Sequence, residues 1–415
     1  MTAALDWLIV GGGIHGVHLA ARLIGEAGVD PAALAVVDGN PRLLARWREC
    51  TANTGMSHLR SAGVHHLDLD PWALKRFTGH RDPAFAPFIA PYNRPALALF
   101  DAHCDAVIDR YALAARHRRA RVEAIALGDR EARVALDDGD TLAARHVILA
   151  LGLSDQPAWP PFARALRADG AAVEHVFTPG HALADAAPGE RIAVIGGGIS
   201  AAQVALRLAR AGRVALVSRH PLRERDFDSD LGWIGPKYLA GFHRIADRDR
   251  RRAIIDAQRH RGSVPGEVHR AVRKAIASGA ITWRAGEVEA ATGGPDAITL
   301  RVADAAFEVD RLVLATGFER ARPGGAMLDR LVADAGLPCA ACGYPIVDAH
   351  LRWHPRLFVS GPLAELELGP VARNIVGARH AAARLVERIG RARPRAVALS
   401  APGPRGGPSS REVRP

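Results

Sequence analysis

The hydrophobic pattern of the chain repeats one arrangement twice. A short, almost unbroken apolar run ends at Val10, and a second ends at Ile195; each leads directly into three consecutive glycines and then into an alanine-rich segment. An apolar run of this length is typical of a strand, and the glycines that follow it indicate a tight turn. We therefore expect strand, turn and helix in the same order at both places, followed by a second strand at 34–38 and at 214–218.

The spacing of the glycines predicts a dinucleotide-binding turn at each place. The first glycine allows the sharp turn, the second has no Cβ and lets the backbone approach a pyrophosphate, and a third small residue lets helix and strand pack closely. The helix N-terminus then offers free N–H groups to the phosphates. The residues expected to contact the dinucleotides are Gly11, Gly13, Ile14, His15 and Gly16 in the first turn and Gly196, Gly198, Ile199 and Ser200 in the second, where Ala201 takes the third position.

The residue that ends each second strand separates the two predicted sites. Asp38 ends the first, and a carboxylate there accepts hydrogen bonds from a ribose 2′-OH, which suits FAD or NAD. Ser218 and Arg219 end the second, where no acid is present and an arginine can bind a 2′-phosphate bidentately. We therefore expect FAD at the first site and NADPH at the second. The alternative for Arg219 is a solvated surface arginine in an arginine-rich chain.

Two further apolar strands complete the repeat, at 146–152 and at 311–317, and each follows a short meander. The second ends in Ala315-Thr316-Gly317. With these strands the chain resembles the two-dinucleotide-domain flavoproteins related to glutathione reductase. The resemblance implies an α/β fold of two Rossmann-like dinucleotide-binding domains, with the NADPH domain inserted in the FAD domain. The expected boundaries are 1–158 for the first part of the FAD domain, 159–310 for the NADPH domain with a helical segment at 237–280, 311–391 for the second part of the FAD domain, and 392–415 for a disordered tail.

Composition narrows the range of partners. The chain has 415 residues, a net charge of +11 and a pI near 10.4, but almost all of the positive charge is arginine spread along the sequence. It contains no aromatic-and-basic stripe and no nucleic-acid-binding module. It also lacks a run of about 18 apolar residues and a secretory signal, so we expect no membrane partner and a cytoplasmic location. The expected partners are a small-molecule substrate and O₂, and the oligomeric state stays open.

The pair Cys339 and Cys342 has the spacing of a redox disulfide or of half a zinc site. A second pair of zinc ligands at suitable spacing is missing, so we expect no metal. Compared with the flavoproteins that the chain resembles, the pair lies outside the places where they carry an active disulfide. We therefore expect these thiols to be spectators, with a flavin-linked disulfide as the less favoured alternative.

The middle of the chain indicates a branch of this superfamily. The turn at 196–203 and the segment Phe227–Tyr238 resemble the NADPH turn and the following loop of the ornithine and lysine N-hydroxylases, with Ile199 in place of the usual Gln and Gln203 in place of the usual Glu. The resemblance implies an NADPH-dependent FAD monooxygenase that oxygenates a small nucleophile, chiefly an amine, through a flavin C4a-hydroperoxide. The alternative is a flavin reductase or dehydrogenase of a quinone, a ferredoxin or a disulfide, and a third is a flavin-binding protein without catalysis.

The same resemblance points to three segments around the flavin. The stretch 56–68 would run beside the ring and the substrate, with Arg60, His65 and His66 as candidate catalytic residues; adjacent histidines on a strand face opposite ways, so at most one meets the substrate. A structural pair of histidines is an equal alternative. The second segment, 92–95, would open a helix that runs to Tyr111, with polar side chains toward the flavin. The last segment, 358–374, would place a helix N-terminus, with Pro370 in its first turn, at the pyrimidine end of the ring. The further cofactor contacts expected are Trp47, Arg94, Thr316, Gly317, Gly361, Gly369, Pro370 and Val371.

Overall fold

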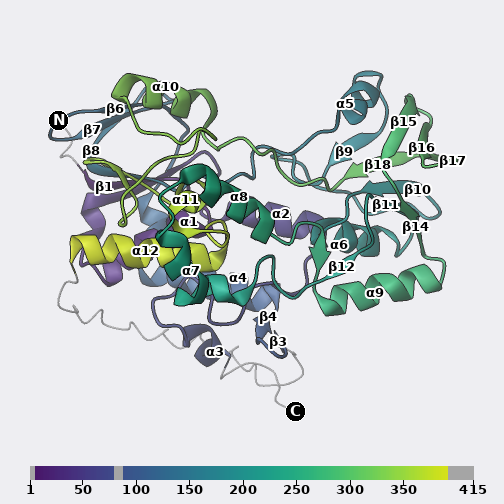
Figure 1. The fold of residues 1–415 in the computed structure, drawn as a ribbon, viewed down its shortest axis with the longest axis horizontal. Coiled ribbons are helices and arrows are strands. Elements are labelled where there is room, and N and C mark those ends of the chain that lie inside the picture. The colour runs from purple at the N-terminus through teal and green to yellow at the C-terminus, as the bar shows by residue number, and fades with distance from the viewer. Residues whose placement is uncertain (1–4, 79–86, 391–415) are drawn as a thin grey trace, which may run out of the picture.

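Two α/β units lie at opposite ends of the long axis of the molecule (Figure 1). The computed structural model describes residues 5–78 and 87–390, and the predicted disordered tail, 392–415, lies outside the described residues. The purple start and the yellow end of the chain build one unit together, whereas the middle of the chain builds the other (Figure 1). No helix in the described part of the chain is long and apolar enough to cross a membrane.

The first unit is built on an eight-stranded sheet. Its main path runs in the order β19 (Arg352–His354), β20 (Leu357–Val359), β8 (Thr141–Leu149), β1 (Leu5–Val10), β2 (Leu34–Asp38) and β5 (His117–Arg119), and the meander strands β6 (Val122–Leu127) and β7 (Ala132–Leu136) join it at β8. All pairs from β20 to β5 are parallel. The order reverses beside β1, so the turn after β1 opens at the switch point where such sheets bind ligands.

The second unit repeats this plan. Its five parallel strands run in the order β14 (Ile281–Ala285), β11 (Arg213–Ser218), β10 (Arg191–Ile195), β18 (Arg311–Leu314) and β9 (Val173–His175). A separate antiparallel meander of β15 (Val288–Gly293), β16 (Ile298–Val302) and β17 (Ala305–Val309) lies beside it. The predicted double Rossmann-like α/β fold is therefore confirmed. The boundary expected after residue 310 falls one strand too early, because β18 pairs with β10 and β9 in the second sheet.

Both sheets are covered on both faces, which explains the continuous apolar runs in the sequence. Along β1, Trp7 and Ile9 pack into one core, while Leu8 and Val10 pack into another core on the opposite face. The helices that cover the sheets or connect the units are α1 (Ile14–Gly25), α2 (Ala45–Thr54), α3 (Ala73–Phe77), α4 (Leu97–Arg110), α5 (Pro161–Ala168), α6 (Ile199–Leu208), α7 (Pro236–His243), α8 (Arg248–Gln258), α9 (Gly266–Ala277), α10 (Gly325–Ala335), α11 (Glu365–Leu368) and α12 (Ile375–Ile389).

The interface between the units is held by side chains that hydrogen-bond to backbone carbonyls. On α2, Arg46 donates to the carbonyls of Ser154 and Phe177. The amide of Asn53, at the end of the same helix, donates to the carbonyls of Val176 and His181 at 2.9 and 2.7 Å. Both side chains are buried, so these bonds are shielded from water and fix how the two units sit against each other.

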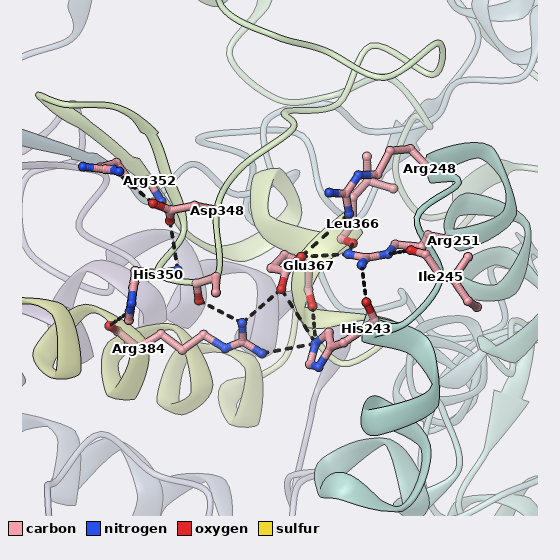
Figure 2. A network of polar contacts seen from close by, with 11 residues as sticks. His243, Ile245, Arg248, Arg251, Asp348, His350, Arg352, Leu366, Glu367 and Arg384 are labelled. Carbon is pink, nitrogen blue, oxygen red and sulfur yellow. Dashed lines mark hydrogen bonds and ion pairs between the residues drawn. The ribbon is translucent and has the colours of Figure 1, made fainter.

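A second connection runs through a buried carboxylate, Glu367 (Figure 2). Its oxygens accept from Arg251 on α8 at 2.7 Å and from Arg384 on α12 at 3.1 Å. His243, at the end of α7, hydrogen-bonds to the Glu367 backbone carbonyl at 2.9 Å. Arg251 also donates to the carbonyls of Ile245, His243 and Leu366. Through its carboxylate and its backbone carbonyl, Glu367 thus ties α8 and α7, from the middle of the chain, to the last helices of the first unit.

Glu367→Gln should destabilise the fold by about 3–5 kcal/mol, because it leaves the buried cation of Arg251 without its counter-charge. Urea unfolding of the flavin-free protein, monitored by circular dichroism, measures the difference. Glu387→Gln is the control, since Glu387 is an exposed residue of α12. Equal stability of both variants and the wild type would contradict the proposed role of Glu367.

Candidate functional site

Both glycine-rich turns open into one cavity of about 2,100 Å³. It lies where the carboxyl ends of β1 and β10 face each other, and it is lined by Gly11, Gly13, Ile14 and His15 from the first turn and by Gly196, Gly198, Ile199 and Ser200 from the second. Asp38, Trp47, Thr316, Gly317 and Val371, also predicted from sequence, line it too. The cavity is large enough to hold two dinucleotides that share one reaction space.

The glycines of the first turn differ in the space around them, as dinucleotide binding requires. A Cβ on Gly11 would lie 2.6 Å from the Ala150 carbonyl oxygen, and the φ of Gly11 is +112°, which side chains rarely adopt. A Cβ on Gly16 would lie 1.8 Å from the Gly11 carbonyl oxygen, so helix α1 touches the strand there. By contrast, a Cβ on Gly13 would meet no atom within 4 Å. The open space at Gly13 fits a pyrophosphate lying against the backbone.

The second turn has the same arrangement. A Cβ on Gly196 would lie 2.5 Å from the carbonyl oxygen of Ala315, at the end of β18. A Cβ on Gly198 would meet only the Cα of Gly262, at 3.8 Å. Both turns therefore combine a closely packed first glycine with an open one beside the cavity. The open space at Gly198 therefore fits the pyrophosphate of a second dinucleotide.

Asp38 ends β2 beside the first turn. Its carboxylate accepts from the backbone N–H of Gly12 at 2.6 Å and from the backbone N–H of Asn40 at 2.8 Å. The side-chain amide of Asn40 also donates to Oδ1, at 2.7 Å. These bonds hold the carboxylate in place, and Oδ2, which accepts only from Gly12, keeps acceptor capacity for a ribose hydroxyl. The geometry fits the predicted role of Asp38.

His15 forms part of the wall between the first turn and the last strand. Its Nδ1 lies 2.8 Å from the Ser360 hydroxyl, after β20, and its ring lies against the position that a Cβ on Gly361 would take. Desolvation by burial lowers the pKa of His15 to about 4. The imidazole is therefore neutral at pH 7 and adds no positive charge beside the first turn.

At the second site, the two residues expected to meet a 2′-phosphate face different ways. The Ser218 hydroxyl is buried, donates to the His220 carbonyl at 2.7 Å and accepts from the Trp283 indole at 3.1 Å. Its hydrogen bonds are turned inward, away from an incoming phosphate. The Arg219 side chain is 75 % exposed and lies 3.4 Å from Glu287. Of the two residues, only Arg219 is free to reach a ligand.

Arg60 does not have a free guanidinium, contrary to the sequence-based expectation. It donates to the carbonyls of Arg225, Asp226 and Phe227, and also to the carbonyl and hydroxyl oxygens of Ser263. All three of its nitrogens are engaged, although the side chain borders the cavity. Arg60 therefore joins the first unit to two backbone segments of the second and has little capacity left for a flavin or a substrate carboxylate.

Arg94 is engaged in the same way. Its guanidinium forms a bidentate pair with Glu267 on α9, at 2.9 and 2.6 Å, and its side chain is buried. It lies in the short strand β4 (Arg94–Pro95), which precedes α4 instead of opening it. The predicted contact of Arg94 with the flavin is corrected, because its guanidinium is occupied by Glu267. The sequence did not indicate this, since Glu267 lies far from Arg94 along the chain.

The two adjacent histidines have different surroundings, although residues 65 and 66 lie in a loop and not on the expected strand. His65 lines the cavity, whereas His66 is fully buried and its Nε2 lies 3.0 Å from the Pro71 carbonyl. Burial lowers the pKa of both rings to about 4, so both are neutral at pH 7. Of the pair, His65 alone can meet a ligand in the cavity, and His66 holds the local loop.

The last helix begins later than expected. Helix α12 starts at Ile375, because Gly369 has a φ of +75° and the residues after it form turns. Gly369 and Pro370 are buried outside the cavity, with Gly369 against Trp233. The helix N-terminus that reaches the cavity carries Arg373, Asn374, Ile375 and Val376. Asn is a favoured N-cap residue, and its position before an apolar helical segment is the signal that could have located this start.

Two lining residues have structural partners as well. The indole N–H of Trp47 donates to Asp101 at 3.0 Å, and its ring packs on Phe100. The Thr316 hydroxyl donates to the Ala158 carbonyl at 2.5 Å, which joins the end of β18 to the segment entering the second unit. Both residues therefore shape the cavity wall more than they offer free polar groups.

Cys342 also lines the cavity, which the sequence did not indicate. It is exposed on a hairpin that is closed by a backbone β-bridge between Cys339 and Pro345. Cys339 and Cys342 are both free thiols. Cys50 lines the cavity too, but desolvation by burial raises the pKa of its thiol to about 11. A thiol with that pKa stays protonated and is a poor nucleophile.

Two family profiles match the chain. The profile described as pyridine nucleotide-disulphide oxidoreductase matches residues 90–384, more than half of the chain. The chain belongs to this family. The profile described as FAD-NAD(P)-binding matches residues 8–154. The predictions of an oxidoreductase that uses FAD and a nicotinamide coenzyme are therefore confirmed. No curated protein sequence is significantly similar to the chain.

Solved structures share the fold over nearly the whole chain. The FAD-bound cadaverine monooxygenase of the desferrioxamine pathway from Erwinia amylovora is 16% identical, with a TM-score of 0.72 over 94% of this chain and 95% of its own. The ornithine hydroxylase from Pseudomonas aeruginosa is 19% identical, with a TM-score of 0.72 over 93% and 99%. The bacillithiol disulfide reductase from Bacillus cereus is 17% identical, with a TM-score of 0.57 over 93% and 99%. These matches confirm the predicted resemblance in fold to the N-hydroxylating flavin monooxygenases.

Gly13→Val should fold normally but weaken FAD binding by about tenfold or more, because its side chain would fill the space that fits a pyrophosphate. Flavin content after purification and fluorescence titration of the flavin-free protein measure the effect. Gly235→Val is the control, since Gly235 also precedes a helix and also has open space around its Cβ position. Full flavin content in Gly13→Val would mean that the first site is elsewhere.

Proposed function

We propose that the protein is an NADPH-dependent FAD monooxygenase that transfers oxygen to a small nucleophilic substrate, with amine N-hydroxylation as its reaction. The observation that carries the proposal is the single cavity into which both glycine turns open, because hydride transfer between a nicotinamide and a flavin needs both in one space. The N-hydroxylating neighbours also have a higher TM-score, 0.72, than the disulfide reductase, 0.57.

The groups that would hold the cofactors follow from the fit of each turn. The N-terminus of α1, with Gly11, Gly13 and Asp38, would hold the FAD, and the N-terminus of α6, with Gly196, Gly198 and Arg219, would hold NADPH. Bound FAD supplies the redox and oxygen-activating chemistry. The chain supplies orientation and a cavity wall from which apolar side chains such as Met56, Leu59 and Ile375 exclude water.

His65 would position the substrate and not serve as a base. Its pKa of about 4, lowered by burial, keeps the ring neutral at pH 7. A neutral imidazole can accept a hydrogen bond from an amine N–H without repelling a neighbouring positive charge. It is a weak base at that pKa, so we assign it a hydrogen-bonding role and no proton transfer.

The alternative, a flavin-dependent disulfide reductase, is favoured by one observation: exposed Cys342 borders the same cavity. Against it, Cys339 is partly buried, and desolvation raises the pKa of its thiol. Cys50, which also lines the cavity, forms no disulfide in the structure, and neither do the other three cysteines.

The deciding experiment is a panel of amines and amino acids tested for substrate-stimulated NADPH oxidation. We expect one compound to speed NADPH oxidation and to yield a hydroxylated product in nearly equal amount, with little hydrogen peroxide. If every compound gave only peroxide, while a quinone or a disulfide was reduced stoichiometrically, the reductase would be the correct function.

Arg219→Ala should raise the KM for NADPH and leave the KM for NADH unchanged. Losing a hydrogen bond between charged groups costs about 1.5–3 kcal/mol, and screening at this exposed position puts the loss near the lower value, about tenfold in affinity. Glu287→Gln should act in the opposite direction, because Glu287 competes with a phosphate for Arg219. Arg210→Ala, an exposed arginine elsewhere in the same unit, is the control. Equal effects on both coenzymes would exclude the assigned role.

The Cys339→Ser, Cys342→Ser double variant should keep the wild-type rate of NADPH-dependent flavin reduction. Anaerobic titration with dithionite should consume two electrons per FAD in both proteins, because the thiols do not exchange electrons with the flavin. A wild-type endpoint of four electrons that falls to two in the double variant would replace the monooxygenase by the reductase.

A further inference from the structure

A second cavity, of about 660 Å³, opens beside the main one. It is formed by three segments of the chain. They are the short strand β12 (Arg223–Glu224) with Arg225, the segment 256–263 from the end of α8 to the start of the short strand β13 (Ser263–Val264), and Arg320 beyond β18. Asp256, Arg259, Arg261 and Arg320 are among the residues that line both cavities, so the smaller one communicates with the reaction space.

The smaller cavity is strongly positive. Five arginines and two carboxylates line it, which leaves a net charge of +3 with histidine counted as neutral. Arg261 pairs with Asp256 at 2.8 Å, and Glu224 pairs with His269 at 3.2 Å. Among the residues that the structure describes, no carboxylate lies within ion-pairing distance of Arg223, Arg225 or Arg320. Three guanidinium groups without counter-charge therefore face one cavity.

One more donor in this cavity lacks an acceptor. Arg259 lies 3.7 Å from Asp228, and its Nη1 is buried without a hydrogen-bond partner in the described part of the chain. A buried guanidinium N–H left unpaired is costly, and an anion bound beside Arg259 would offer it an acceptor. This unpaired donor points to a ligand more specifically than surface charge alone.

The backbone that carries these arginines is fixed in advance. β12 pairs with β13, so Arg223 lies opposite Ser263. Arg60, from the first unit, donates to the carbonyl of Arg225 at 2.8 Å and to the Ser263 hydroxyl at 2.9 Å. These bonds hold the backbone of two of the three segments, so ligand binding would chiefly order the arginine side chains.

The smaller cavity does not include the residues expected to hold the coenzyme. None of the second glycine turn, Arg219 or the strand-end residues 286–288 lines it, although all of them line the main cavity. The ring of His220 packs between Gly197 and Gly262, since its Cε1 would lie 3.0 and 2.3 Å from Cβ atoms on them, and all three residues line the main cavity only. A coenzyme seated on the second turn would therefore not fill the arginine-lined cavity.

We infer that this arginine-lined cavity binds a phosphate group, or a comparably charged anion, of a small molecule other than the coenzyme. Arginine binds phosphate bidentately, and several unpaired guanidinium groups favour a multiply charged anion over a single carboxylate. The opening into the main cavity lets such a molecule extend toward the flavin. The site does not depend on whether the enzyme transfers oxygen.

The test is calorimetric titration of inorganic pyrophosphate into the FAD-loaded enzyme saturated with NADP⁺, so that both dinucleotide sites are filled. We expect one saturable site, weakened by about tenfold or more in the Arg223→Ala, Arg320→Ala double variant. Both side chains are exposed, so the variant should keep its melting temperature. The Arg130→Ala, Arg210→Ala double variant removes the same charge at exposed positions elsewhere and should bind pyrophosphate like the wild type.

A second measurement identifies the source of the phosphate. The dissociation constants of NADP⁺ and NAD⁺ should be the same in the Arg223→Ala, Arg320→Ala variant as in the wild type. A loss of NADP⁺ affinity alone would mean that the cavity receives the coenzyme's 2′-phosphate, and the inference would be wrong. It would also be wrong if no saturable pyrophosphate binding occurred, or if the control variant weakened binding equally.

Discussion

The structure depends on hydrogen bonds from long side chains to backbone carbonyls across the junction of its two units. Arg46, Asn53 and Arg60 of the first unit each donate to carbonyl oxygens of the second or of the segment that leads into it. Because the donors are buried or half-buried, breaking these bonds would leave polar groups without partners. The junction in turn brings the two glycine turns to one cavity, and the proposed chemistry requires that arrangement.

Local patterns were enough to predict the fold and the two turns. The requirement at Gly16 is local, since a Cβ there would collide with the Gly11 carbonyl. Gly11 and Gly196 have the positive φ that a tight turn needs, although the backbone that a Cβ on them would meet belongs to Ala150 and Ala315, far along the chain. Asp38 was predictable for the same reason, since it ends the strand that follows the turn. Binding residues that are placed by the backbone of a strand, a turn and a helix can therefore be predicted from the sequence.

The role of the arginines was not predictable in this way. Arg60 and Arg94 lie near the expected flavin site in the sequence, yet their partners are more than 160 residues away. The local sequence pattern does not distinguish an arginine that binds a ligand from an arginine that holds another segment of the chain. The predicted start of the last helix was wrong for a related reason. Pro370 is typical of a first helical turn, but Gly369 has a positive φ and the residues after it form turns, so α12 begins only at Ile375.

The contact made by Arg60 also bears on how the enzyme could acquire new specificities. Its acceptors in segment 225–227 are carbonyl oxygens, which every amino acid provides. Substitutions there can therefore alter the side chains that the segment presents while the anchoring bonds persist. A selection experiment that randomised these three positions would explore new ligand contacts on a scaffold whose geometry is secured from the other unit. The junction thus separates the part of the molecule that must stay constant from a part that is free to diversify.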